Sequence, residues 1–254
     1  MNPMRLRRIL VGVGLVATGV ATAGLVVRDR ASRSDPVGAD EAVAAFTAAG
    51  TTSAPNGGPQ PGVYRYRVVG SEEGGAGPFS VRRDLPAEAL LVVTGSGDGW
   101  YAELSYSRQH IEGARYVIRD GAILVTSRRT KVTFAGFGRD DRREADPPSV
   151  FMPANALVGT RWSENSRTGD VEVRGENRVL RSRRITLGSE VIDTLVVEAK
   201  SRITGAHPGT RTEVIWWAPE LGIPARSTVR MDIGGVFGFS TDIQTQLLSA
   251  TPVR

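Results

Sequence analysis

The sequence contains no cysteine, and this absence excludes several kinds of chemistry together. Disulfide bonds, thiolate metal sites, a cysteine nucleophile and a lipid-modified cysteine anchor all require that residue. A chain of 254 residues is nevertheless long enough to bury a sizeable core. The fold must therefore be held together by packing, hydrogen bonds and ion pairs alone.

Histidine is almost as scarce, because the chain has only His110 and His207. A Ser-His-Asp site needs a histidine oriented by a carboxylate beside a nucleophile. His110 lies in the polar stretch 107–113, and His207 begins a His-Pro-Gly turn. No Gly-x-Ser-x-Gly elbow occurs in a strand-to-helix setting, and two histidines without cysteine argue against a zinc site. We expect no enzymatic activity, no catalytic residue, no metal site and no cofactor.

Lysine is rare as well, since 30 of the 32 basic residues are arginine. The formal net charge is +5, but Arg5, Arg7 and Arg8 precede the first apolar run without an acid among them. Without these three, 29 basic residues face 27 acidic ones, which leaves a net charge of +2. So small a charge gives no strong reason to bind nucleic acid. We interpret the arginines as compositional bias and expect no single face of the fold to collect them.

The sequence does contain one long apolar run. Ile9 to Val27 comprises 19 residues without a charge. At ~1.5 Å per residue such a helix spans about 28 Å, close to the roughly 30 Å hydrocarbon core of a bilayer. Three arginines precede the run, whereas residues 28–30 after it carry a net charge of only +1. The positive-inside rule therefore places the N-terminus in the cytoplasm. We expect a cytoplasmic tip (1–8), a transmembrane or signal-anchor helix (9–27) and an extracytoplasmic remainder, which is a single-pass protein of the cell membrane.

A cleaved signal peptide is the alternative interpretation of the same run. Ala21-Thr22-Ala23 fits the small-x-small cleavage pattern, which would release a secreted protein after a cut near Ala23. Against cleavage, the apolar run continues to Val27. Both interpretations export the rest of the chain.

The next region, 28–61, is expected to hold a tether, one short helix and a linker. Asp40 to Ala49 has a helical apolar face, with Asp40 capping its first turn and Gly50 ending it. This helix would pack on a sheet or form a lid over a ligand cavity. A Pro- and Gly-containing linker, Thr51 to Pro61, follows it.

The remainder, 62–254, has the patterns of β-strands rather than helices. Val63 to Val69 alternates between apolar and polar positions, and Asp120-Gly121 is a two-residue hairpin turn between two β-prone runs. We expect a mainly β domain, built as a strongly curved antiparallel sheet or half-barrel with one short packed helix. Two stretches are expected to be loops instead: Ser71 to Pro78, and Gly136 to Ser149 joining two sub-sheets.

The acids of the second loop are one candidate for metal binding. Asp140, Asp141, Glu144 and Asp146 would supply oxygen ligands, but their spacing fits no calcium loop and three arginines neutralise them within the segment. We expect a solvated charged loop.

The hairpin from Arg211 to Arg230 supplies the candidate ligand-binding residues. Trp216 and Trp217 point to opposite faces of its first strand. One should pack in the core, while the other would line a ligand-binding face or cover the outer face of the sheet. Arg226, in the second strand, would pair with a glutamate or clamp an anionic ligand.

Several short motifs resemble a known group of sequences. The opening Pro-Gly-Val-Tyr-Arg-Tyr at 61–66, the Gly-Thr-Arg-Trp at 159–162, the Trp-turn-Gly-x-Pro-x-Arg at 217–226 and the closing 247–252 resemble uncharacterised membrane-anchored extracytoplasmic proteins of high-GC Gram-positive bacteria. Relatives often contain cysteines that this chain lacks, so shared disulfides are not carried over. The long-stranded meander with its helix is also similar in architecture to the half-barrel of bacterial lipoprotein carriers.

These patterns together predict a non-catalytic, membrane-anchored domain of the cell envelope. Its partners would be the membrane, through the N-terminal helix, and an apolar or lipid-like ligand or an envelope protein, but no nucleic acid. The alternative is a structural or protein-interaction ectodomain of a membrane complex. A shared architecture alone does not establish lipid carriage.

Overall fold

The computed structural model describes residues 32–50, 57–75, 80–134, 137–168, 171–205, 207–235 and 238–254. The predicted membrane-spanning segment Ile9–Val27, the cleavage site near Ala23 and residues 51–56 of the linker lie outside this part. Within the described ranges, no helix combines the length and the apolar character needed to cross a bilayer.

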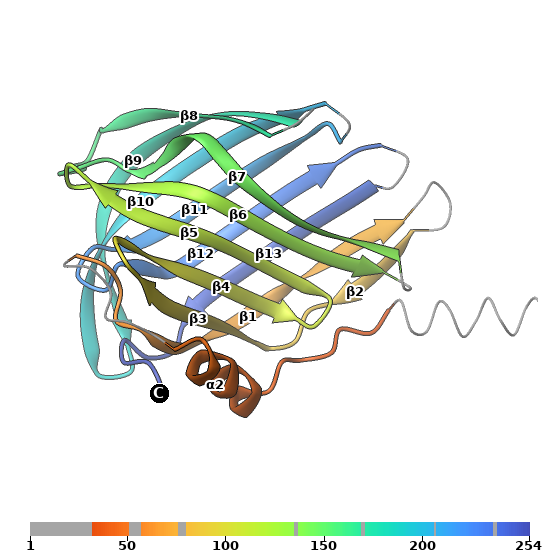
Figure 1. Ribbon diagram of the computed structural model, residues 1–254, viewed down its shortest axis with the longest axis horizontal. Coiled ribbons are helices and arrows are strands. Elements are labelled where there is room, and N and C mark those ends of the chain that lie inside the picture. The colour runs from red at the N-terminus through yellow and green to blue at the C-terminus, as the bar shows by residue number, and fades with distance from the viewer. Residues whose placement is uncertain are drawn as a thin grey trace, which may run out of the picture.

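The described chain is a mainly β structure with one helix, α2, as predicted (Figure 1). Its elements are α2 (Ala39–Ala48), β1 (Gly62–Gly75), β2 (Val81–Asp84), β3 (Glu88–Ser96), β4 (Gly99–Ser107), β5 (His110–Arg119), β6 (Ala122–Phe134), β7 (Phe137–Met152), β8 (Arg161–Thr168), β9 (Val171–Leu187), β10 (Glu190–Thr204), β11 (Gly209–Ala218), β12 (Ile223–Ile233) and β13 (Gly238–Leu247).

These strands form one antiparallel sheet in the order β7-β6-β5-β4-β3-β1-β13-β12-β11-β10-β9-β8, with β2 paired to β1. Two meanders of consecutive strands, β3 to β7 and β8 to β13, are joined where β1 pairs with β13. Figure 1 shows the sheet curling until its two edge strands face each other. The curved sheet is therefore a nearly closed barrel, closer to closure than the half-barrel that the sequence predicts.

The two edges, β7 and β8, lie side by side without a described backbone ladder between them. Side chains join them instead. The indole Nε1 of Trp162 donates a hydrogen bond to the Val150 carbonyl at 3.1 Å, and Arg128 lies 3.1 Å from Glu164. The barrel is thus closed by side-chain contacts at this seam.

Helix α2 packs on the outer face of the barrel. Its buried Ala42 contacts Val63 of β1 and Leu90 of β3, whereas Tyr64 and Leu91, one residue further along each strand, belong to the interior core. The helix therefore covers the convex side, and a lid over an interior cavity is wrong for it. Gly50 follows its C-terminal end with a φ of 60°, as predicted, but the N-cap residue is Gly38 rather than Asp40.

Both stretches predicted as loops are largely strands. Strand β1 continues to Gly75, and Phe137–Met152 forms the edge strand β7. A strand at the edge of a sheet can carry charged residues, because side chains there can reach solvent or an ion-pair partner. Asp140, for example, pairs with Arg129 of β6 at 2.9 Å, so the expected solvated loop is instead a charged edge.

The interior is apolar and aromatic at the end of the barrel that carries the β3–β4 and β11–β12 turns. Four rings contact one another in series across it: Trp100 stacks on Tyr116 at 5.2 Å, Tyr116 meets Phe151 at 5.3 Å, and Phe151 meets Trp217 at 5.3 Å. These rings come from both meanders, so they bridge the barrel. Their burial contributes about 1.5–3 kcal/mol per large side chain.

Candidate functional site: a charged network inside the barrel

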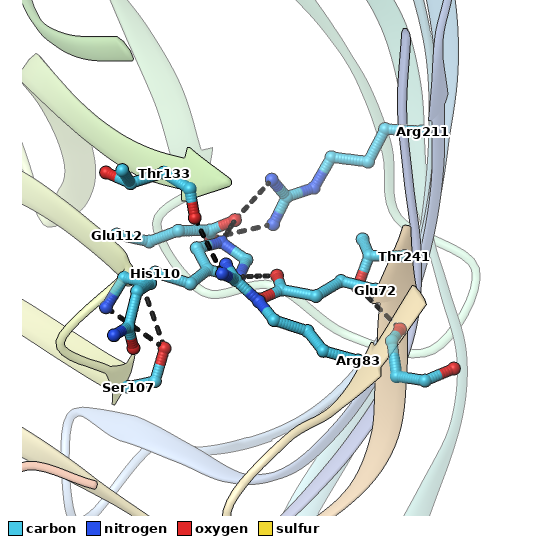
Figure 2. Close-up of polar contacts among 10 residues, drawn as sticks. Glu72, Arg83, Ser107, His110, Glu112, Thr133, Arg211 and Thr241 are labelled. Atoms are coloured by element: carbon cyan, nitrogen blue, oxygen red, sulfur yellow. Dashed lines mark hydrogen bonds and ion pairs between the residues drawn. The ribbon is translucent and has the colours of Figure 1, made fainter. Parts of the chain in front are cut away.

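The opposite end of the barrel interior is charged. Glu72 on β1 and Arg83 on β2 project from one wall, and His110 and Glu112 on β5 project from the facing wall (Figure 2). Arg211 reaches the same group from β11. The carboxylates and cations meet in the space between the walls, and we call this set the interior network: Glu72, Arg83, His110, Glu112, Arg211 and Glu213.

Strand alternation explains why these residues point inward. Side chains two residues apart share a face of a strand. On β5, Glu112 is four residues from the interior ring of Tyr116, and on β11, Arg211 is six residues from the interior ring of Trp217. On β1 the buried Tyr66 places Glu72 inside in the same way.

Arg83 holds Glu72 by a buried ion pair. Its Nε donates to Glu72 Oε1 at 2.6 Å, and the side chains are 1% and 0% exposed. A second nitrogen, Nη1, donates to the Thr133 carbonyl at 2.6 Å, and the guanidinium lies 3.9 Å above the Phe134 ring. Arg83 therefore ties β1 to β6 across the barrel.

His110 lies between two carboxylates and is fully buried. Its Nδ1 is 2.7 Å from Glu72 Oε2, and its Nε2 is 3.6 Å from Glu112 Oε1. Neither ring nitrogen forms an aligned hydrogen bond with its carboxylate, so the contacts are mainly ionic. Tyr106 and Phe239 enclose the ring, at centroid distances of 4.8 and 5.8 Å.

Arg211 completes the network on the far wall. It lies 3.3 Å from Glu112 and 3.2 Å from Glu213, so a single guanidinium bridges two carboxylates. This part of the network is about one fifth exposed, in contrast to the sealed Glu72–Arg83 pair.

The pKa values of these groups follow from their neighbours. Burial alone would lower the pKa of His110, but its close contacts with the Glu112 and Glu72 carboxylates raise it to about 9. Burial alone would raise the pKa of Glu112, yet Arg211 and His110 hold it well below its usual range. The pKa of Glu72 is lowered by His110 and Arg83, again against the effect of burial. At neutral pH the network therefore contains three carboxylates and three cations, and it is balanced only while His110 is protonated.

Each ionisable side chain of the interior network faces an oppositely charged partner. A general base must reach a substrate proton, and a nucleophile must be activated by a neighbouring base. The Oγ of Ser107, a hydroxyl close to His110 in the chain, instead accepts hydrogen bonds from the backbone N–H groups of Gln109 and His110. The described residues contain no cluster of three or more side chains placed to hold a metal ion.

The predicted ligand-binding residues lie elsewhere. Trp217 is in the core against Phe151, and Trp216 is on the outer face, where the Arg226 guanidinium lies 4.9 Å from its ring centroid. Arg226 is exposed and stacks on tryptophan rather than pairing with a glutamate. The structure therefore brings Trp216 and Arg226 together and leaves Trp217 to packing, with none of them in the interior network.

Sequence patterns do not reveal the interior network, because Glu72 lies in a stretch predicted as a Gly-rich loop, and His110 and Glu112 lie in a polar stretch. One signal was available: His110, Glu112, Ala114 and Tyr116 alternate with outward positions in a single strand. That alternation indicates that His110 and Glu112 face the same side as Tyr116.

Gly74→Ala is expected to lower the free energy of unfolding by about 1–3 kcal/mol. An added Cβ would lie 2.5 Å from the Phe134 ring, which cannot retreat without disturbing its stacking on Arg83. Gly238→Ala is the matched control, because the nearest atom to its added Cβ lies 3.6 Å away and the change should stay within about 0.5 kcal/mol. Urea denaturation of both variants measures the difference, and equal stabilities would contradict the proposed contact.

Two hollows on the surface of the described residues are lined mainly by polar residues. The larger, of about 490 Å³, lies over β8 to β11 and is lined by residues that include Arg174, Lys200 and Arg202. The smaller, of about 310 Å³, lies over β1, β12 and β13. Neither has the apolar lining expected of a lipid site.

Comparisons of the chain with protein-family models, with curated proteins and with solved structures found no match, so its function is argued from geometry alone.

Proposed function

We propose that this chain is a non-catalytic, membrane-anchored extracytoplasmic domain of the cell envelope that acts by binding. The observation that carries the non-catalytic part is the interior network, whose ionisable groups are paired with one another. Glu72, Arg83 and His110 are closed off from solvent and so have no access to a substrate, while the charges of the partly exposed remainder face one another.

The N-terminal tether supports the membrane-anchored part of the proposal. The Asp35 N–H donates to Gln109 Oε1 at 2.9 Å, and the Arg108 N–H donates to the Asp35 carbonyl at 2.8 Å. The chain is thus fixed to the β4–β5 turn at residue 35. Asp35 is the eighth residue after Val27, and an extended chain over these eight steps spans at most about 28 Å. A membrane-spanning segment 9–27 would hold the charged end of the barrel toward the bilayer.

A reporter fused after Arg254 tests this topology. An enzyme active only outside the cytoplasm should be active in this fusion, and the full-length product should sediment with membranes. A fusion that is active only in the cytosol would overturn the proposal. A product shortened by the leader and found in the medium would favour the secreted alternative while retaining the extracytoplasmic location.

A lipid-like ligand is a second candidate, because the barrel interior is apolar at one end and charged at the other. Such a ligand would have to displace the rings of Trp100, Tyr116, Phe151 and Trp217, which contact one another across the interior. Native mass spectrometry of the full chain in mild detergent distinguishes a barrel that holds a lipid from one filled by its own side chains. We expect the protein mass alone, and a bound lipid surviving at one per chain would establish the lipid-binding version.

A further inference from the structure

One outer face of the sheet collects arginines, contrary to the expectation from composition. Because Trp217 packs inside, its neighbour Trp216 faces outward, and its cross-strand partners Val196 and Arg226 share that face. Arg181 lies opposite Val196 on the next strand. A row of four partners therefore crosses this side of β12, β11, β10 and β9, with an exposed arginine at each end and the buried Val196 within it.

Neighbouring positions on the same face add more arginines. Arg183 lies opposite Thr194, and Arg178 lies opposite Glu198; these partners are two residues to either side of Val196. Arg178 also lies opposite Arg161 of β8. We call this set the arginine face: Arg161, Arg178, Arg181, Arg183, Arg226 and Trp216.

The arginine face carries uncompensated positive charge. All five arginines are exposed, and no described carboxylate lies within ion-pair distance of any of them. The nearest acid in the register, Glu198, pairs with Lys200 at 3.0 Å, and the next, Glu176, lies at the margin of the face. Some exposed arginines elsewhere on the barrel are paired, as Arg65 is with Glu88, and others are not.

Two details indicate that this charge is arranged for a ligand. Arg161 and Arg178 are directly opposite each other in the ladder, a placement of like charges that destabilises a sheet and that a bound anion would relieve. The guanidinium of Arg226 is held 4.9 Å from the Trp216 ring centroid, which orients its donors before any ligand binds.

We propose that the arginine face binds a linear polymer of phosphodiester-linked units in the cell envelope. Guanidinium groups bind phosphate through two parallel N–H donors, and a row of them favours a ligand whose phosphates repeat. Arg226 and Arg181 are three strands apart, about 14 Å at the usual strand spacing, so one phosphate group cannot contact both. Trp216 between them offers an apolar surface to the segment that links two phosphates.

Position favours a polymer over the surface of the protein's own membrane. Trp216 and Arg226 flank the β11–β12 turn, which lies at the opposite end of the barrel from the β4–β5 turn where the tether is fixed. The face is thus directed away from the anchored end. This inference rests on the proposed extracytoplasmic function and adds the chemistry of the partner.

The test uses the full chain in detergent with poly(glycerol phosphate) as the probe and unphosphorylated polyglycerol as the uncharged control ligand. Isothermal titration at several salt concentrations should show binding to the phosphate polymer alone. Each engaged cation contributes about 0.7 to the slope of log affinity against log salt for a single chain of phosphates, so five arginines predict a slope of about −3.5.

A triple variant, Arg178→Gln/Arg181→Gln/Arg183→Gln, should weaken binding at least about tenfold and reduce the slope by about 2. The matched control, Arg82→Gln/Arg119→Gln/Arg254→Gln, removes the same charge from exposed arginines outside the face and should retain affinity within about twofold. Circular dichroism of both variants verifies folding. Equal losses in the two variants, or no binding to the probe at low salt, would overturn the proposal.

Anionic lipid vesicles form the third arm of the test. If the triple variant lost binding to vesicles but not to the polymer, the partner would be a membrane and the proposal would be wrong. These results are independent of the reporter fusion, because a cytosolic reporter would remove the proposed location while leaving the measured affinity unchanged.

Discussion

Arg83→Met is expected to lower the free energy of unfolding by about 3–5 kcal/mol, because it leaves Glu72 charged and buried without its arginine partner. The two side chains are 1% and 0% exposed and lie 2.6 Å apart. The replacement is close in length to arginine, so most of the packing against Phe134 is retained. Urea denaturation followed by tryptophan fluorescence measures the change.

Two further variants show whether the loss comes from the orphaned charge. Arg65→Met breaks an exposed ion pair with Glu88, in which both side chains are about half exposed, and should cost less than about 1 kcal/mol. Glu72→Gln added to Arg83→Met removes the unpaired charge and should restore part of the stability. If the double variant were as unstable as the sum of the single ones, the loss would lie in packing and our explanation would be wrong.

Stability is expected to fall by about 3 kcal/mol as the pH rises from about 6.5 to above 9. The pKa of His110 is raised from 6.5 to about 9 in the folded protein. A histidine whose pKa is raised by folding stabilises fully below its unfolded pKa, and that contribution is lost as the pH passes its folded pKa. Above about pH 9 the interior network has one more negative charge than positive charges.

The lowered pKa values of Glu72 and Glu112 act in the opposite direction. Their contribution is present above their unfolded pKa of 4.5 and is lost as the pH falls below it. Stability should therefore be greatest between about pH 5 and 6.5.

Denaturation midpoints measured from pH 5 to 10 test the alkaline loss. His110→Gln should be less stable at pH 6 but should lack most of the decrease between pH 6.5 and 9. The matched control is His207→Gln, which changes the other histidine, located in the segment before β11 outside the network, and should keep the full decrease. A decrease of the same size in His110→Gln would show that another group is responsible.

The strand pattern could be predicted from the sequence where local signals are strong. Asp120 and Gly121 adopt φ angles of 52° and 76° in the turn between β5 and β6, as their types indicate. Alternating runs such as Val63 to Val69 are strands for the same local reason. The prediction failed at Phe137–Met152, since a charged edge strand has no apolar face to reveal it.

The interior network could not be located with equal ease. Its ion pairs join residues far apart in the chain, such as Arg211 and Glu112, and the pairing of β1 with β13 that closes this space leaves no local signal. The arginine face is hidden in a similar way. Arg161 and Arg226 share a face only because β8 to β12 lie side by side in the sheet. The net charge of the whole chain does not reveal a local excess of positive charge on one face.

The pairing of β1 with β13 also determines when the protein can fold during synthesis. The second edge of β1 pairs with residues 238–247, far later in the chain than β1 itself. Until the ribosome has added that segment, the two meanders are separate sheets and β1 presents an unpaired edge. The barrel can therefore close only after this segment has been synthesised. A chain truncated before Gly238 would expose the unpaired edge of β1, which could pair with other chains and cause aggregation.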